Sequence, residues 1–367
     1  MQELKVLQKT ASLHEGRWWE TEPGGRVHCF LCPRHCHIGE GQSGFCFIRI
    51  NQGGRLYSLG YASPAALQID PIEKKPLNHF LPGTAVLSFG TAGCNLTCKF
   101  CQNWDISKAR ELDRVQQIAS PEAIAQATLA SGARSVAFTY NDPVIFLEYA
   151  VDVAQACRAV GVKTVAVTAG YIGEGARPEF FAAMDAANID LKAFTESFYK
   201  RLCTGSLDAV LDTLRYVKHE TGTWLEITTL LIPGENDSSE EVGALCDWVG
   251  DKLGPDVPLH FTAFHPDWKM RDIVPTPPTT LKRAREFALS TGLHYVYTGN
   301  VHDEAGQSTY CAQCGSTLIG RDWYRITSWG LDAHGACAAC GGRCRGLFDP
   351  QPGRWGAKRA PVVIAAA

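Results

Sequence analysis

Three cysteines, Cys94, Cys98 and Cys101, are spaced C-x3-C-x2-C and directly follow an apolar, strand-like run at Ala85–Phe89. Three thiolates on one loop can hold three irons of a cubane 4Fe–4S cluster, whereas such clusters usually take four. The fourth iron would then be open to a substrate or cofactor. The alternatives are a structural zinc site, which usually takes two C-x2-C pairs, or part of a ferredoxin-like site. No fourth cysteine follows nearby, so the spacing favours a cluster with one open iron.

A second group of cysteines lies near the N-terminus, at Cys29, Cys32, Cys36 and Cys46. Its spacing, C-x2-C-x3-C-x9-C, supplies enough thiolates for one four-ligand site, and the surrounding glycines and proline suit tight turns. Either zinc or a second iron–sulfur cluster would fit this set of ligands. Buried cysteines that bind no metal are the alternative.

A third group consists of two C-x2-C-Gly pairs, with Cys311, Cys314, Cys337 and Cys340 as the expected ligands. Two such pairs predict a zinc ribbon, and rubredoxin-like iron is the alternative. The residues between the pairs, at Leu318–Trp329, alternate enough in polarity to form a hairpin. A module this small needs a stabilising cross-link in addition to its apolar core, and structural zinc can provide one.

The composition limits where the protein acts. The chain has 367 residues, a formal net charge of −3 and 15 cysteines. Clustered cysteines in a reducing compartment are more readily explained as metal ligands than as disulfides. The charge balance predicts neither a nucleic acid nor a membrane partner, and no apolar run reaches the roughly 18 residues of a membrane span. The first residues, Met1–Lys5, lack the apolar core of a signal peptide. We therefore expect a cytoplasmic protein in which Cys157, Cys203 and Cys246, outside the three groups, are small buried hydrophobes.

Short apolar runs alternate with helical patterns between about Thr84 and Asn300, which predicts a parallel sheet with right-handed crossovers. The expected strands are Ala85–Phe89, Ser135–Tyr140, Lys163–Thr168, Ile189–Lys192, Leu225–Ile232, Leu259–Phe264 and His294–Tyr297. The expected helices include Glu122–Ser131, Pro143–Val160, Ser206–Glu220 and Ser238–Leu253. Six or seven strand–helix units are fewer than the eight of a complete barrel.

Phe100 completes the sequence C-x3-C-x-aromatic-C, and at these residues the chain resembles the radical SAM superfamily. The resemblance implies a partial (β/α)6 barrel, open on one side, in agreement with the alternating pattern. It implies that S-adenosylmethionine (SAM) chelates the open iron through its amino and carboxylate groups. The reduced cluster would cleave SAM to methionine and a 5′-deoxyadenosyl radical, which abstracts hydrogen from a substrate. Phe100 would pack near the adenine.

The same resemblance implies contacts to SAM at the ends of the second and third strands. Tyr140, Asn141 and Asp142 stand where family members carry a Gly-Gly-Glu-Pro-type motif that binds the SAM ammonium group. This chain differs from that motif at all three positions, and a simple turn is the alternative. Gly170 follows the third strand, where the absence of a side chain would let the backbone come close to the cofactor.

Two further strands are implied to contribute to the SAM site. Asp190 and Lys192 lie in the expected fourth strand and point the same way. In the activating enzymes that the chain resembles, an Asp-x-Lys sequence here faces the SAM carboxylate and ribose, and an internal salt bridge is the alternative. His265 follows the sixth strand, at the position of a histidine that contacts SAM in those enzymes. His260, inside that strand, is expected to be structural.

Several longer runs carry a narrower resemblance, to the radical SAM enzyme of the AmmeMemoRadiSam system, a relative of pyruvate formate-lyase activating enzymes. These runs are Cys29–Cys36, Asp70–Leu77, Gly93–Trp104, Tyr297–Val301 and the C-terminal cysteine pairs. The resemblance implies companion proteins of the Ammecr and Memo types, and a reductant such as flavodoxin or ferredoxin. It also suggests an activating-enzyme-like reaction, in which hydrogen is abstracted from a glycine of a partner protein.

These observations predict a radical SAM oxidoreductase with an unidentified substrate. Its expected segments are an N-terminal cysteine-rich module at residues 1–82, a radical SAM core at 83–302, a zinc-ribbon-like module at 303–350 and a frayed tail at 351–367. The alternative is a non-catalytic iron–sulfur or zinc protein that carries electrons or binds other proteins. An electron carrier would need a fourth cysteine ligand near Cys94–Cys101.

Overall fold

A nine-stranded sheet forms the centre of the computed structural model, which describes residues 13–109 and 117–364. Seven of its strands are parallel and lie side by side in chain order. They are β8 (Ala85–Gly90), β9 (Ser135–Phe138), β10 (Lys163–Thr168), β11 (Ala186–Asp190), β12 (Trp224–Leu231), β13 (Leu259–Ala263) and β14 (Val296–Gly299). Among the described residues β14 and β8 do not pair, so the barrel stays open.

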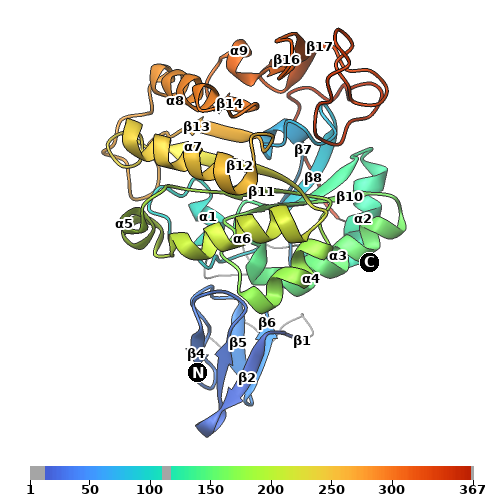
Figure 1. Cartoon of the computed structure of the whole chain (residues 1–367). Coiled ribbons are helices and arrows are strands. Elements are labelled where there is room, and N and C mark those ends of the chain that lie inside the picture. Colours follow the sequence, from blue (N-terminus) through green and yellow to red (C-terminus); the bar gives the residue numbers. More distant parts are fainter. Residues whose placement is uncertain (1–12, 110–116, 365–367) are drawn as a thin grey trace.

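Helices connect these strands and cover the outer face of the sheet (Figure 1). The six connecting helices are α2 (Pro121–Ala130), α3 (Leu147–Ala159), α4 (Arg177–Ala182), α6 (Leu207–Glu220), α7 (Ser239–Leu253) and α8 (Pro278–Ser290). Helix α7 shows why these segments form helices. Val242, Leu245 and Val249 are buried at helical spacing and form its apolar face. At its start, the Ser238 side chain accepts a hydrogen bond from the Glu241 amide and so caps the helix. The shorter helices are α1 (Trp104–Ser107), α5 (Glu196–Phe198) and α9 (Glu304–Gln307).

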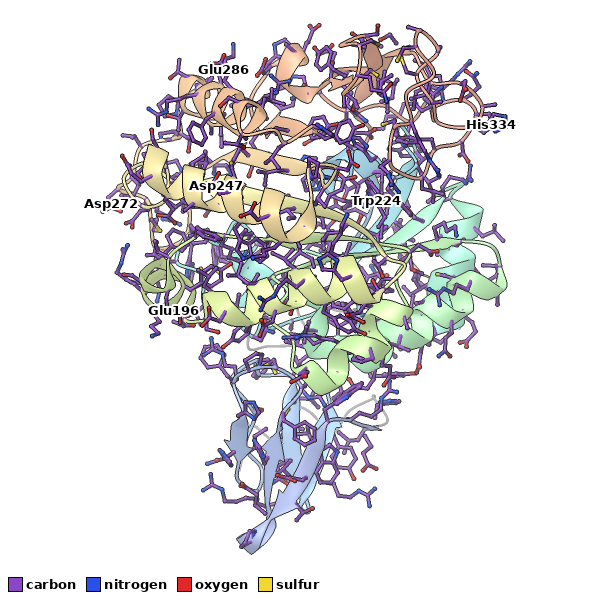
Figure 2. All side chains as sticks on the ribbon, viewed as in Figure 1. Glu196, Trp224, Asp247, Asp272, Glu286 and His334 are labelled. Carbon is purple, nitrogen blue, oxygen red and sulfur yellow. The ribbon has the colours of Figure 1, made fainter. Side chains whose placement is uncertain are left out.

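Two smaller parts lie at opposite ends of the core (Figure 1). The N-terminal part holds two three-stranded sheets made of β1 (His14–Glu15), β2 (Trp19–Glu22), β3 (Arg26–Cys29), β4 (Cys36–Ile38), β5 (Arg49–Gln52) and β6 (Arg55–Ser58). The C-terminal part has one sheet, of β15 (Thr309–Tyr310), β16 (Thr317–Asp322) and β17 (Arg325–Trp329). Exposed polar residues such as Glu286 of α8 and His334 of the C-terminal part lie at the periphery (Figure 2).

The structure confirms the parallel α/β core, and it corrects three expectations about the elements. The fourth strand ends at Asp190, so Lys192 follows the strand and does not lie in it. Its start, Ala186, lies earlier than expected because Asn188 is buried in the strand and donates to the Pro76 carbonyl. The second strand ends at Phe138 because Tyr140 adopts a positive φ of 72°.

The third correction concerns the expected segments. Strand β7 (Ala65–Pro71), within residues 1–82, pairs antiparallel with β8, and β18 (Ala360–Pro361), within the expected frayed tail, pairs with β7. Each adds backbone hydrogen bonds along an open edge of the barrel sheet, so the boundaries at 82 and 351 do not separate independent units. Residues 1–12 and 365–367 of these segments, Met1–Lys5 included, lie outside the described residues. Within the described part, no helix combines the length and apolar composition needed to cross a bilayer.

Candidate active site

A cavity of about 570 Å³ opens at the carboxyl ends of the parallel strands. Because parallel strands end at the same edge, residues far apart in the sequence meet there. Most of the site residues predicted from the sequence line it: Cys94, Cys98, Phe100, Cys101, Tyr140, Asn141, Asp142, Asp190, Lys192 and His265. The cysteine loop follows β8 as expected, and all three of its cysteines are partly buried.

Backbone and side-chain contacts from distant segments hold the cysteine loop in place. The Thr97 amide donates to the Cys203 carbonyl over 3.0 Å. The Lys108 ammonium donates to the Leu96 carbonyl over 2.8 Å, which places a cation beside the three thiols. Neither Lys108 nor Cys203 was predicted for the site, because neither belongs to a recognisable motif.

The electrostatic surroundings of the thiols suit metal binding. Burial raises the pKa of the Cys94 thiol to about 12, and the nearby Asp142 carboxyl adds to the rise, so this thiol stays protonated at neutral pH unless a metal displaces the proton. Cys98 is different, because a hydrogen bond from the Cys203 thiol lowers its pKa. Cys203 is buried, as expected, but it is therefore more than a small hydrophobe. The structure does not place Cys203 on the cavity wall.

Asp142 offers one free carboxylate oxygen at the cavity. Its Oδ1 accepts hydrogen bonds from Thr168 Oγ1 over 2.8 Å and from the Val144 amide over 3.2 Å. Its Oδ2 is buried and has no hydrogen-bond partner. Burial raises the pKa of Asp142 to about 6, although the Thr168 hydrogen bond opposes the rise. A buried oxygen without a hydrogen-bond donor costs free energy. A ligand with an ammonium group could donate the missing hydrogen bond, so the site fits such a ligand.

The two residues before Asp142 shape the cavity and connect it to its surroundings. The Asn141 amide donates to the carbonyls of Thr91 and Gly93, each over 2.8 Å, and so fixes the turn that leads into the cysteine loop. The Tyr140 hydroxyl donates to Asp70 over 2.8 Å. Asn141 therefore uses its side chain within the protein, and its predicted contact to SAM would come from the backbone.

Gly170 is one predicted site residue that does not line the cavity; Thr168 and Ala169 do so instead. Gly170 has a positive φ of 66°, and a Cβ there would lie 2.9 Å from the Ile189 side chain. Packing against the barrel wall is thus enough to require glycine at this position. Its predicted role in cofactor binding stays a prediction.

Asp190 and Lys192 form an ion pair of 2.7 Å on the cavity wall. Lys192 is the more buried partner, and the carboxylate of Asp190 together with the nearby Cys98 and Cys203 keeps its pKa high despite the opposing effect of burial. The salt bridge that was the alternative for this pair is therefore present, and it faces the same space as the cysteines. His265 also lines the cavity but is exposed.

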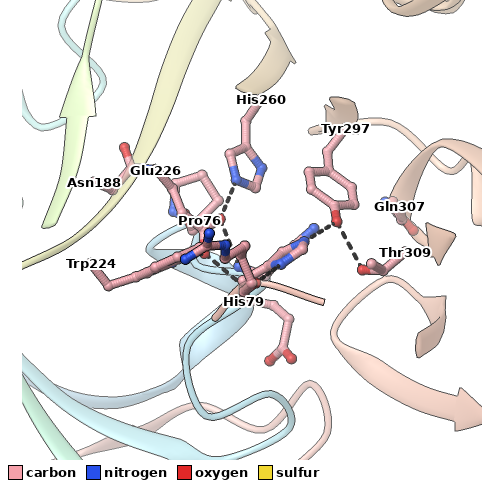
Figure 3. Close-up of polar contacts among 12 residues, drawn as sticks. Pro76, His79, Asn188, Trp224, Glu226, His260, Tyr297, Gln307 and Thr309 are labelled. Carbon is pink, nitrogen blue, oxygen red and sulfur yellow. Dashed lines mark hydrogen bonds and ion pairs between the residues drawn. The ribbon is translucent and has the colours of Figure 1, made fainter. Parts of the chain in front are cut away.

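A buried polar network that includes His260 of the cavity wall links β12, β13 and β14 to the segment after β7 (Figure 3). Glu226 accepts hydrogen bonds from His260 Nε2 over 2.7 Å and from the His79 amide over 2.8 Å. The His79 ring contacts the Tyr297 hydroxyl, which in turn contacts Thr309 Oγ1 over 2.8 Å. This network ties the segment after β7 to the C-terminal part. It also supports the structural role expected for His260.

The C-terminal cysteines form a compact group. The sulfurs of Cys311, Cys314, Cys337 and Cys340 all lie within 4.8 Å of one another, with Cys311–Cys340 at 3.6 Å and Cys314–Cys337 at 3.8 Å. Four thiolates about 2.3 Å from one zinc would be separated by roughly 3.8 Å in a tetrahedron. The expected hairpin is present as β16 and β17.

The N-terminal cysteines also converge. Cys29 and Cys36 are paired across β3 and β4, and they line one small cavity with Cys32 and Cys46. Asn95, which follows Cys94, lines the same cavity. The two cysteine groups near the barrel are therefore neighbours, which the sequence pattern did not predict.

Sequence comparisons with known proteins agree with the family suggested by the cysteine spacing. A family model described as the radical SAM superfamily matches residues 89–247. An uncharacterized protein from Methanocaldococcus jannaschii is 40% identical over 330 residues, which cover 90% of this chain and 98% of that protein. A pyruvate formate-lyase-activating enzyme from Clostridium pasteurianum is 24% identical over 205 residues, which cover 52% of this chain and 84% of that enzyme. The crystal structure of Streptococcus suis SuiB bound to S-adenosylmethionine aligns with a TM-score of 0.48 and 17% identity, over 63% of this chain and 53% of that one.

Proposed function

Since the chain belongs to the radical SAM superfamily, we propose that Cys94, Cys98 and Cys101 hold a 4Fe–4S cluster and that the cavity beside them binds SAM for reductive cleavage. One observation carries the proposal: the three cysteines and the unpartnered oxygen of Asp142 face the same cavity. When reduced, a cluster bound there supplies the electron that splits SAM into methionine and a 5′-deoxyadenosyl radical.

In this proposal the protein side chains bind and orient SAM. Asp142 Oδ2 accepts from the SAM ammonium group, which completes its hydrogen bonding. The ion pair of Asp190 and Lys192 faces the SAM ribose and carboxylate, with Lys192 as the donor to the carboxylate. Phe100 packs near the adenine, and it is buried at the cavity wall against Phe198. His265 is a further contact at the mouth.

The far part of the cavity is our candidate for the substrate site of this oxidoreductase. Thr228, His260, Arg321, Trp323 and Tyr324 line it, and the last three come from the C-terminal part. A glycine of a partner protein is one candidate substrate, because relatives that are 24% and 28% identical are named pyruvate formate-lyase-activating enzymes. We propose a flavodoxin or ferredoxin as the reductant, and zinc as the metal of the C-terminal cysteines.

We also propose that the chain is the radical SAM member of the AmmeMemoRadiSam system, with companions of the Ammecr and Memo types. The support is the set of sequence runs that includes Cys29–Cys36 and Asp70–Leu77. In the structure the second run lies beside the cavity, because Glu73, Lys74 and Lys75 line it.

The structure argues against a simple electron carrier. Such a protein would need a fourth thiolate at the cluster, and the additional cysteine near the loop, Cys203, contacts Cys98 and not the cavity. In our proposal the fourth iron therefore takes its ligand from outside the chain.

The proposal predicts that SAM binds directly to the reduced cluster. In the anaerobically reconstituted and reduced protein, we expect addition of SAM to shift the electron paramagnetic resonance (EPR) signal of the cluster. The Cys98→Ala variant should lose the part of the signal that SAM shifts, and Cys157→Ala, which replaces a buried cysteine of α3, should behave like the parent protein. An unchanged signal with saturating SAM would contradict the proposal.

The affinity for SAM is expected to fall as the pH drops through about 6, because Asp142 then takes up a proton and no longer offers a charged acceptor. The sign follows from the raised pKa: the carboxylate is ionised above that pH and neutral below it. Calorimetric titration of SAM between pH 5 and pH 8 measures the effect. Asp142→Asn should bind SAM weakly at every pH, and an Asp142→Asn profile like that of the parent protein would rule out this role.

A further inference from the structure

We propose that Cys29, Cys32, Cys36 and Cys46 bind an iron–sulfur cluster, not zinc, and that this cluster passes electrons to the one held by Cys94, Cys98 and Cys101. The relay rests on the proposed function, whereas the identity of the N-terminal metal does not. The sequence left both zinc and iron open at these residues, and the spacing of the sulfurs in the structure favours iron.

The spacing differs between the cysteine groups of the chain. The four C-terminal sulfurs lie within 4.8 Å of one another, as thiolates that share a single ion must. Among the described residues, no other three cysteine sulfurs are that close together. The N-terminal four nevertheless surround one common cavity. Each thiolate of a cubane binds a different iron, so the sulfurs stand farther apart around a larger centre. Neither the N-terminal four nor Cys94, Cys98 and Cys101 show the close spacing of the C-terminal group, and we take this difference to favour a cluster over a single ion.

The lining of the N-terminal cavity also suits an iron–sulfur cluster. Arg49 is 2% exposed and lines the cavity, and its Nε has no hydrogen-bond partner. Its Nη1 is held by Glu148 over 3.0 Å, which fixes the orientation of the guanidinium. The Phe45 amide donates to Cys36 Sγ over 3.5 Å. Free N–H groups that face the sulfur atoms of a cluster raise its reduction potential and so favour its reduction.

The two cysteine groups are in direct contact through their backbones. Gly93, which precedes Cys94, has a φ of 85°, and a Cβ there would lie 2.1 Å from the Cys46 carbonyl oxygen. Only glycine allows the two loops to come this close. Arg34 completes the contact, since its Nε donates to the Asn95 carbonyl over 2.7 Å. Each ligand loop therefore touches the other within two residues of a proposed ligand.

Electrons can enter the N-terminal group from solution. Cys29 and Cys46 are buried, but Cys32 and Cys36 are partly exposed. In one relay cycle, a one-electron donor of the flavodoxin class is oxidised and the N-terminal cluster is reduced. That cluster is then reoxidised as the catalytic cluster accepts the same electron. No bond is made or broken in the protein, and no proton needs to move.

Metal analysis of cysteine variants tests the identity of the N-terminal metal. We would reconstitute the full chain anaerobically and compare the parent protein with Cys94→Ala/Cys98→Ala/Cys101→Ala, with Cys29→Ala/Cys46→Ala and with the control Cys246→Ala. The catalytic triple variant should retain about four irons and four sulfides per chain, together with one zinc in the C-terminal group. An EPR signal that SAM does not shift should remain after reduction. Two zinc ions and no iron in this variant would overturn the proposal.

Mössbauer spectroscopy of the unmodified protein provides a check that needs no variant to fold. The proposal predicts iron equivalent to about two cubane clusters per chain. Iron equivalent to one cluster, with a second zinc, would contradict it. Neither outcome depends on SAM cleavage, so the failure of this proposal and the failure of the catalytic proposal can be told apart.

The relay is tested by rates of reduction. Flavodoxin hydroquinone would be mixed rapidly with the oxidised protein, and reduction of the catalytic cluster would be followed by the SAM-shifted EPR signal. We expect the fast phase to disappear in Cys29→Ala/Cys46→Ala and to persist in Cys246→Ala. Titanium(III) citrate should still reduce the catalytic cluster to full extent in the double variant, which shows that the cluster itself is intact. Equal rates in the parent protein and the double variant would refute the relay.

Discussion

Replacing Glu226 by alanine is expected to lower the free energy of unfolding by about 3–5 kcal/mol, the range found when one partner of a buried charged pair is removed. Glu226 is fully buried in β12 and accepts from four donors, namely the Asn78 and His79 amides, Trp224 Nε1 and His260 Nε2. Alanine would leave all four donors, one of them only partly buried, without this acceptor. Denaturant titration of the reconstituted protein under anaerobic conditions measures the loss.

The matched control is Glu220→Ala, which removes an exposed glutamate from the end of α6 and should change stability by less than about 0.5 kcal/mol. The pH dependence has a defined sign. Burial would raise the pKa of Glu226, but the hydrogen bond and charge of His260 outweigh it, so the pKa is lowered. Because the pKa of Glu226 is lower in the folded than in the unfolded state, its ionised form stabilises the folded protein above the unfolded-state pKa. This stabilisation is lost as the pH falls through the folded-state pKa. Equal free energies of unfolding for Glu226→Ala and Glu220→Ala would show that the network around Glu226 does not stabilise the fold.

Loss of the C-terminal metal is expected to unfold the C-terminal part of the chain. Structural zinc contributes apparent binding free energies of about 10–16 kcal/mol to small modules, and this part buries only a small apolar cluster around Leu318 and Ile319. Cys340→Ala removes one of the four convergent sulfurs. We expect the variant to lose its zinc and to gain rapid hydrogen exchange in β16 and β17.

The consequence should reach the cavity, because Arg321 of β16 donates to the Asn78 carbonyl over 2.7 Å and lines the proposed substrate site. Hydrogen exchange should therefore also increase around Asn78. Cys246→Ala serves as the control, since it removes a buried cysteine of α7 that belongs to none of the three cysteine groups. Retention of zinc and of protected β16 amides in Cys340→Ala would contradict the assignment of these four ligands.

Local patterns predicted the parts of the site that depend on neighbours in the sequence. The spacing of Cys94, Cys98 and Cys101 and their place after an apolar strand were enough to predict the cluster loop, and the alternation of elements predicted the parallel sheet. Asp142 could be placed at the cavity because a strand ends just before it.

Contacts between distant segments could not be predicted in the same way. Arg34 reaches Asn95 across 61 residues, and Glu226 reaches His79 across 147. No spacing rule links such pairs, and Lys108 resembles any exposed lysine in the sequence. Strand β18 was missed because it has only two residues, and β7 was missed because it pairs antiparallel with β8, outside the strand–helix alternation that predicted the core.

The central claim is that Cys94, Cys98 and Cys101 support reductive cleavage of SAM. The most direct test is to measure 5′-deoxyadenosine by mass spectrometry after the reconstituted, reduced protein has been incubated with SAM. We predict that the product forms with the parent protein and with Cys246→Ala, and that none forms with Cys98→Ala. Absence of the product from protein with a fully loaded cluster and a SAM-shifted EPR signal, or its equal formation by Cys98→Ala, would contradict the claim.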